Sequence, residues 1–107
     1  MSDRIDNVSV GKKANVFFDG KCVSHSVFLP DGSRKTVGVI LPEAKLTFNV
    51  GTPELMEITA GECSVKIAGE PAFKTYTAGT SFRVAENSSF EIHATYEVNY
   101  VCSFGSD

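Results

Sequence analysis

Apolar and polar residues alternate along most of the chain, in short runs separated by turn residues. Leu46, Phe48 and Val50 alternate with polar neighbours, and apolar side chains occupy every second position from Tyr96 to Phe104. A period of two residues is typical of a strand with one buried face. Further strands of this kind are expected within Cys22–Leu29, Arg34–Leu41, Met56–Ile58, Cys63–Ile67, Phe73–Thr77, Phe82–Val84 and Phe90–Ile92.

Turn signals punctuate these runs at close spacing. Gly, Pro, Asn and Asp gather between the runs, as in Leu29-Pro-Asp-Gly32, Gly51-Thr-Pro53 and Glu86-Asn-Ser-Ser89. These residue types set the backbone angles that tight turns need. No window combines a helical period with capping residues. The pattern therefore predicts an all-β sandwich or barrel with no helix longer than about two turns.

Length and charge narrow the function classes. A chain of 107 residues holds one domain, 1–107, in which we expect residues 1–14 to form a partly ordered extension. The formal net charge of -3 argues against a nucleic-acid partner, because phosphates need basic surface. No apolar run approaches the roughly 20 residues of a membrane span, and the polar N-terminus lacks the apolar stretch of a secretion signal. We therefore expect a cytoplasmic protein with no membrane partner.

The three cysteines do not form a metal or redox motif. Cys22, Cys63 and Cys102 are an odd number, far apart, with no Cys-x-x-Cys pair. Buried small hydrophobic residues in a reducing cytosol account for them. A catalytic thiol needs a nearby base, and nothing in the sequence places His25 or His93 beside a cysteine.

Motifs spread over the chain from about Asn15 onward resemble one family. They are Arg34-Lys-Thr-Val-Gly38-Val, Thr47-Phe48, Thr52-Pro-Glu54-x-Met56, Gly61, Ala78-Gly79-x-x-Phe82-x-Val84, Ser89-Phe90 and Tyr100-x-Cys102. In order and spacing they are similar to the pyrimidine/purine nucleoside phosphorylase family. The resemblance implies a single jelly-roll cupin β-barrel, a homodimer, and phosphorolysis of purine and pyrimidine nucleosides to free base and pentose 1-phosphate.

The usual metal positions of a cupin hold apolar residues here. A metal cupin carries His-x-His, then Glu, then Gly, and a last His in its second motif. Counting back from Glu54 and Gly61 puts the first two histidine positions at Phe48 and Val50, and the last falls near Phe90. Apolar side chains cannot coordinate a metal. We therefore predict no metal and no cofactor.

Arg34 and Glu54 are the candidate catalytic residues. A guanidinium can grip phosphate in a bidentate manner, and Arg34 matches the family's arginine, although a solvated residue after a turn is the alternative. Lys35 and Arg83 are weaker candidates. Glu54 points inward in the cupin frame, where an unpaired carboxylate is costly. It could bind ribose hydroxyls or stabilise a cationic transition state, and the alternative is a turn cap.

Substrate-binding candidates are aromatic and hydroxyl side chains. Phe48, Phe82, Phe90 and Tyr100 fall on predicted inward faces, where rings either stack on a nucleobase or simply fill the core. Tyr100 can also hydrogen-bond. Thr52 and Thr47 could donate hydrogen bonds to phosphate, but threonine also suits strands and turns. His93 alternates outward with Glu91, so it is either a surface residue or a general acid at a dimer interface.

Two function classes remain at this point. One is a metal-independent nucleoside phosphorylase that takes nucleoside and inorganic phosphate. The other is a non-catalytic cupin dimer that binds a small molecule or serves as a structural module. Arg34 together with Glu54 favours the enzyme, because a simple binding barrel has no need of a phosphate grip facing a carboxylate. A metal-dependent cupin oxygenase or isomerase is disfavoured by the missing histidines.

Overall fold

The computed structural model describes residues 3–105, which are almost entirely β-structure. Its one helical element in this range is a single turn of 3-10 helix, so the all-β prediction is confirmed. The elements are β1 Ser9–Val10, β2 Asn15–Phe17, η1 Phe18–Gly20, β3 Cys22–Phe28, β4 Arg34–Ile40, β5 Ala44–Val50, β6 Glu54–Ala60, β7 Glu62–Ile67, β8 Lys74–Thr77, β9 Ser81–Val84, β10 Ser88–Ala94 and β11 Val98–Phe104. No helix among the described residues is long and apolar enough to cross a membrane.

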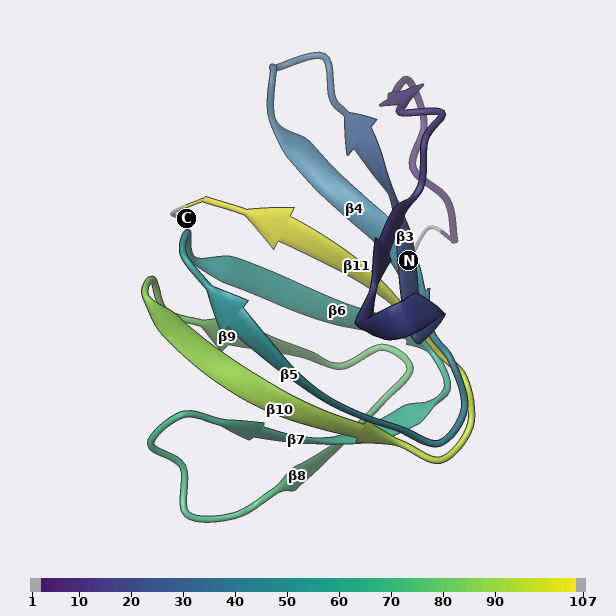
Figure 1. The fold of residues 1–107 in the computed structure, drawn as a ribbon. Coiled ribbons are helices and arrows are strands. Elements are labelled where there is room, and N and C mark those ends of the chain that lie inside the picture. Colours follow the sequence, from purple (N-terminus) through teal and green to yellow (C-terminus); the bar gives the residue numbers. More distant parts are fainter. Residues whose placement is uncertain (1–2, 106–107) are drawn as a thin grey trace.

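The strands form two sheets that pack face to face (Figure 1). The larger has seven strands in the order β1-β3-β4-β11-β6-β9, with β2 also paired to β3. The smaller has four strands in the order β5-β10-β7-β8. The strand pairs are antiparallel, as expected for strands joined by short turns.

The core lies between the inner faces of the two sheets. In β10, Phe90, Ile92 and Ala94 are buried while the residues between them are not, so the period of two predicted from the sequence holds. Residues from both sheets make one apolar cluster. Its fully enclosed members include Ile40, Ile58, Val65, Ile92 and Val98.

Two strands begin later in the structure than the sequence pattern predicts. The last apolar run was expected from Tyr96, but β11 begins at Val98 and Tyr96 is 75% exposed in the preceding turn. The strand expected from Phe73 begins at Lys74. Alternation in a turn looks the same as alternation in a strand, so the pattern alone does not mark these boundaries.

The turn between β6 and β7 packs closely against the backbone that precedes β11. Gly61 has φ +90°, and a Cβ atom added there would lie 2.6 Å from the backbone oxygen of Glu97. The register of β11 against β6 shifts nearby, between Asn99 and Tyr100. A glycine is therefore required at this turn for both its conformation and its contact.

Candidate functional site

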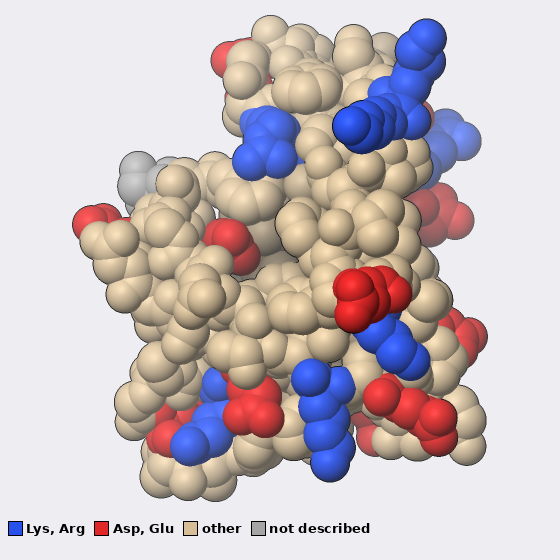
Figure 2. Space-filling model, viewed as in Figure 1, with Lys and Arg blue, Asp and Glu red and all other residues tan. Residues whose placement is uncertain are grey.

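A hollow of about 530 Å³ opens between the two sheets. In the view of Figure 2 the surface is hollowed near its middle, mostly among uncharged side chains, with an acidic group beside the hollow. The lining residues are Asn15, Phe17, Phe18, Ser24, Arg34, Thr36, Thr47, Phe48, Asn49, Glu54, Met56, Phe90, Tyr100, Cys102 and Phe104. The hollow thus brings together both predicted catalytic residues, Arg34 and Glu54, and three predicted substrate-binding residues, Phe48, Phe90 and Tyr100.

The charged side of the hollow follows from strand register. Phe104 of β11 pairs with Glu54 of β6, and on its other side Ser103 pairs with Lys35, so Arg34 stands beside Phe104. The guanidinium of Arg34 lies over the Phe104 ring, 4.2 Å from its centre. Arg34, Phe104 and Glu54 therefore occupy one row across three neighbouring strands, with the Phe104 strand between the other two.

Glu54 sits half-buried at the start of β6. Burial raises the pKa of its carboxyl group, while a hydrogen bond with the Cys102 thiol and the positive charge of Arg34 oppose that rise. Burial, followed by the neighbouring Glu54 charge, raises the pKa of the Cys102 thiol far above its usual range. Cys102 therefore stays protonated and donates its S–H to the carboxylate, one row deeper in the sheet.

Tyr100 lies across β4 because position 38 is glycine. A Cβ atom at Gly38 would lie 2.7 Å from the Tyr100 hydroxyl oxygen and 2.8 Å from the Ser24 Cβ. The hydroxyl lies 3.3 Å from the Cys22 sulfur and also hydrogen-bonds with Ser24. Burial raises the pKa of the phenol far above its usual range, so Tyr100 is a neutral group at physiological pH.

Rings from the four-stranded sheet form the opposite side of the hollow. Phe48 of β5 pairs with Phe90 of β10, and their rings stack with centres 5.1 Å apart and an interplanar angle of 14°. Phe90 is almost fully buried, whereas Phe48 is only half-buried. Phe18 of η1 meets Phe48 edge to face, with ring centres 5.0 Å apart. A flat aromatic ligand can stack at such a surface whatever its substituents.

Two predicted site residues lie outside the hollow. Thr52 is exposed in the turn between β5 and β6. Phe82 of β9 is buried beyond Met56, and its ring packs against Phe90 and Tyr76 in the core. Of the remaining candidates, Thr47 lines the hollow, whereas His93 lies on the outer face of β10, with Nε2 2.7 Å from Glu91 Oε2.

Some lining residues were not among the sequence candidates. Phe18, Phe104 and Cys102 reach the hollow, as does Asn15, whose side-chain amide lies 3.3 Å from the Ser24 hydroxyl. Phe104 and Cys102 belong to the same alternating run as Tyr100, so their inward direction was visible in the sequence. The sequence did not show that Phe104 would stand between Arg34 and Glu54 in the order of the strands, because alternation does not encode which strands pair.

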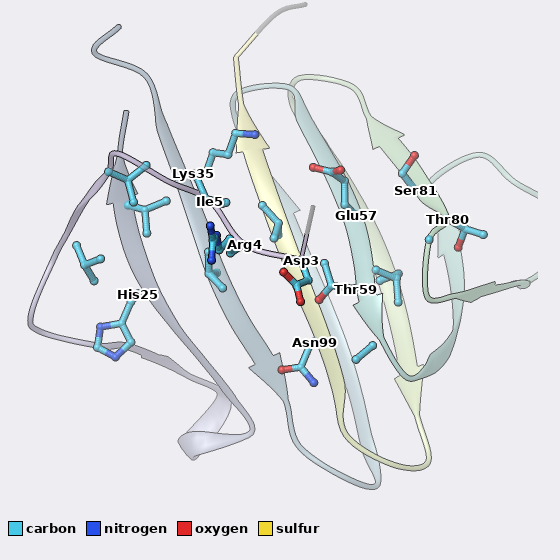
Figure 3. Close-up of a pocket in the computed structure, with 18 residues that line it drawn as sticks. Asp3, Arg4, Ile5, His25, Lys35, Glu57, Thr59, Thr80, Ser81 and Asn99 are labelled. Carbon is cyan, nitrogen blue, oxygen red and sulfur yellow. The ribbon is translucent and has the colours of Figure 1, made fainter. Parts of the chain in front are cut away.

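A larger hollow of about 1040 Å³ lies on the outer face of the seven-stranded sheet (Figure 3). Lys35 and Glu57 line it, together with the Asp3–Ile5 segment, which crosses over the sheet. Among the described residues that line it there is no Phe, Tyr or Trp ring, and of the sequence candidates only Lys35, a weaker one, is there. The inner hollow, which combines cation, carboxylate and rings, is therefore the candidate active site.

No metal site is apparent in the part of the chain that the structure describes. Within residues 3–105 no three His, Cys, Asp or Glu side chains gather closely enough to hold a metal ion. Phe48 and Phe90 are stacked rings at two of the positions compared with cupin ligands, and Val50 is buried in the core. All three cysteines are buried and free, as expected from the sequence.

Comparisons with known proteins agree with this architecture. The profile of the family described as "Pyrimidine/purine nucleoside phosphorylase" matches residues 12–104. A protein of that name from Cupriavidus metallidurans is 61% identical over 102 residues, which are 95% of this chain and 98% of the relative.

Solved structures show the same fold. A protein of unknown function from Acinetobacter sp. ADP1 superimposes with a TM-score of 0.93 at 49% identity, covering 96% of this chain and 99% of that one. The cupin domain of Cnp3 from Schizosaccharomyces pombe gives a TM-score of 0.66 at 14% identity, covering 80% of this chain and 61% of that one. The fold is therefore that of a cupin.

Proposed function

Because the chain belongs to the pyrimidine/purine nucleoside phosphorylase family, we propose that it is a nucleoside phosphorylase. It transfers the pentose of purine and pyrimidine nucleosides to inorganic phosphate and releases the free base. The observation that carries this proposal is the row of Arg34, Phe104 and Glu54 on one sheet, facing stacked rings on the other. Arg34 is proposed to bind the phosphate, Glu54 the sugar and the stacked rings the base.

Arg34 binds the phosphate in this proposal. Its guanidinium is exposed at the mouth of the hollow, already oriented by the Phe104 ring and by Ser26, whose hydroxyl lies 3.5 Å from Nη1. A planar guanidinium can donate two parallel hydrogen bonds to phosphate oxygens. Because the cation is held before phosphate arrives, less conformational freedom is lost on binding.

Glu54 serves the sugar. As a phosphate oxygen bonds to the anomeric carbon, the bond from that carbon to the base nitrogen breaks, and its electron pair leaves with the base. The sugar carries positive charge in between, and a nearby carboxylate stabilises that charge. The Cys102 thiol and the Arg34 charge help to keep Glu54 ionised within its half-buried surroundings.

The rings bind the base. Phe48 presents its half-buried ring to the hollow and is backed by Phe90. Stacking on such rings tolerates both purines and pyrimidines, since every base has a π-face. Tyr100 supplies a fixed neutral hydroxyl at the inner end of the hollow. The reaction needs no metal in this proposal, since the protein's own cation and carboxylate meet the charges that develop.

Direct measurement of base release tests the proposal. The protein is incubated with uridine or inosine, with and without inorganic phosphate, and the free base is measured by chromatography. We expect base only when phosphate is present, together with an equal amount of pentose 1-phosphate. A double variant, Arg34→Ala with Glu54→Gln, controls for contaminating enzymes. If the wild-type protein releases no base from either nucleoside, a ligand-binding cupin without activity takes the place of the enzyme.

We further propose that the protein is a cytoplasmic homodimer. Three buried free thiols are typical of a reducing compartment. The outer face of the seven-stranded sheet carries apolar side chains, among them Val37 and Val101, with Lys35 and Glu57 nearby. A second copy related by a two-fold axis could cover the valines and pair these opposite charges.

A further inference from the structure

The turn before β3 has an unusual backbone. Phe18, Asp19 and Gly20 all have positive φ, at 55°, 54° and 90°. Glycine adopts such angles freely, but a bulky aromatic residue does so only against steric resistance. No side-chain capping hydrogen bond stabilises the turn at its start, and its own backbone bond runs from Lys21 N–H to the Phe18 oxygen at 3.1 Å. The conformation is therefore held at a cost in local energy.

This turn places the Phe18 ring at the entrance of the candidate active site. The ring is 40% exposed and contacts the half-buried Phe48 ring at an interplanar angle of 76°. Behind Phe48 lie Phe90 and then Phe82, each in ring contact with the one before. The aromatic series thus runs from the core to solvent, and Phe18 is its exposed end.

Core packing does not account for Phe18. Phe18 is 40% exposed and meets the core only through the Phe48 ring, whereas Phe48 and Phe104 are partly buried and pack against the core directly. An exposed ring gains less from burial than a core ring does, so little apolar stabilisation offsets the strained turn. An unfavourable backbone and an exposed ring at the mouth of the same hollow are explained together when the ring contacts a ligand.

We propose that Phe18 is a substrate-binding residue that forms the outer wall of the nucleobase subsite. Two rings at 76° form a corner, into which a flat heteroaromatic base fits with its face on one ring and its edge towards the other. This corner is on the aromatic side of the hollow, away from the side that carries Arg34 and Glu54. The inference rests on the proposed nucleoside phosphorylase function and adds a residue that sets affinity for the base.

The chain offers a closely matched control for the test. Phe73 is 39% exposed, and its ring packs on His93, outside the hollow. Phe18→Ala and Phe73→Ala therefore remove the same side chain at nearly equal exposure. Steady-state kinetics give KM for uridine and inosine at saturating phosphate, and KM for phosphate at saturating nucleoside. Calorimetry with inosine alone measures nucleoside binding without turnover.

We expect Phe18→Ala to raise KM for both nucleosides by about tenfold or more, as the loss of a stacked ring does. KM for phosphate should change less than twofold, and Phe73→Ala should leave both constants near wild type. Phe18→Tyr keeps the π-face and should restore nucleoside affinity. Phe18→Leu, with similar bulk but no π-face, should not, and it serves if the alanine variant melts too low to assay.

Different results would overturn the role of Phe18 and the phosphorylase function. If wild type cleaves nucleosides and Phe18→Ala and Phe18→Leu match Phe73→Ala in every constant, the Phe18 assignment is overturned while the phosphorylase function stands. An equal rise in KM for nucleoside and phosphate would also overturn it, because it would indicate general damage to the site. If wild type neither cleaves nor binds nucleosides, the function itself fails, and the base subsite with it.

Discussion

Arg34 combines exposure with order at the start of β4. The turn before it is fixed by Asp31, whose Oδ1 accepts hydrogen bonds from both the backbone N–H and the hydroxyl of Ser33. The guanidinium then rests on Phe104. A ring beneath a cation orients it without neutralising its charge, so the charge remains available to an anion.

Removal of the Arg34 charge should weaken the binding of phosphate more than it affects any other step of the reaction. We expect Arg34→Ala to raise KM for phosphate by roughly 10- to 100-fold, the usual value of a charge-assisted hydrogen bond. Arg34→Lys should recover only part of the loss, because an ammonium cannot donate in a bidentate manner. Lys45→Ala, an exposed cation on β5 that does not line the hollow, is the control. Equal phosphate KM in the Arg34→Ala and Lys45→Ala variants would contradict the assignment.

The contribution of Glu54 to the free energy of unfolding should fall as pH rises. Its pKa is raised by burial, so the folded protein binds this proton more tightly than the unfolded chain does. Glu54 therefore favours folding at pH below the ordinary glutamate value of about 4.3. This contribution is lost as pH rises through the folded pKa.

Glu54→Gln should accordingly melt at a higher temperature than wild type at pH 7, with a gap that narrows towards pH 4. The same variant should lower kcat more than it raises KM, because the lost charge acts on the transition state. Thermal melts from pH 4 to pH 8 give the first result and steady-state kinetics the second. Glu86→Gln, at an exposed position in the turn between β9 and β10, corrects for the change in net charge. A wild type more stable than Glu54→Gln at neutral pH would refute the stability argument.

At the scale of the strands, alternation was enough to predict most of the strands and which face of each is buried. Phe90 and Tyr100 were expected inward because they share a period of two with buried neighbours, and both are buried. Thr52 and Phe82 show the limit of that argument. An inward or turn position does not tell whether a residue reaches the hollow, which depends on the strand at its side. Phe82 is on β9, at the edge of the sheet, where Phe90 covers it.

The backbone conformation of the turns could not be predicted from the sequence. An aromatic pair before Asp19 and Gly20 indicates a turn, but not one with consecutive left-handed residues. Such a conformation depends on contacts made elsewhere, which local patterns do not contain. Likewise, the need for glycine at position 38 becomes visible only when the Tyr100 ring is seen to cross it.

The turn from β6 to β7 permits a controlled test of tight packing. Gly61 and Gly79 have almost the same φ, +90° and +91°, but a Cβ at Gly61 would meet the Glu97 oxygen whereas one at Gly79 would meet nothing within 4 Å. Alanine at either site carries the left-handed penalty of about 1–2 kcal/mol. We expect Gly61→Ala to lose a further ~1–3 kcal/mol of unfolding free energy, as overpacked sites do. Urea denaturation of both variants measures the difference, and equal losses would contradict it.

At the scale of the whole molecule, the outer face of the seven-stranded sheet predicts the assembly. Val37 is 41% exposed at the centre of that face. We expect sedimentation to give twice the chain mass of 11.5 kDa, and Val37→Lys to shift the protein towards the monomer by burying a charge at the interface. Tyr96→Lys, in the exposed turn before β11, should stay dimeric. A wild type that sediments as a monomer at micromolar concentration would rule out this interface.

The division of the hollow between two sheets has a practical consequence for protein engineering. Arg34 and Glu54 belong to the seven-stranded sheet, while Phe48 and Phe90 belong to the four-stranded one. In the proposed function, Phe48 and Phe90 can therefore be randomised on β5 and β10 without altering the strands that carry Arg34 and Glu54, while Phe18 of η1 and Tyr100 of β11 are kept. A library confined to those two strands would be a direct route to enzymes that accept unnatural bases while keeping their demand for phosphate.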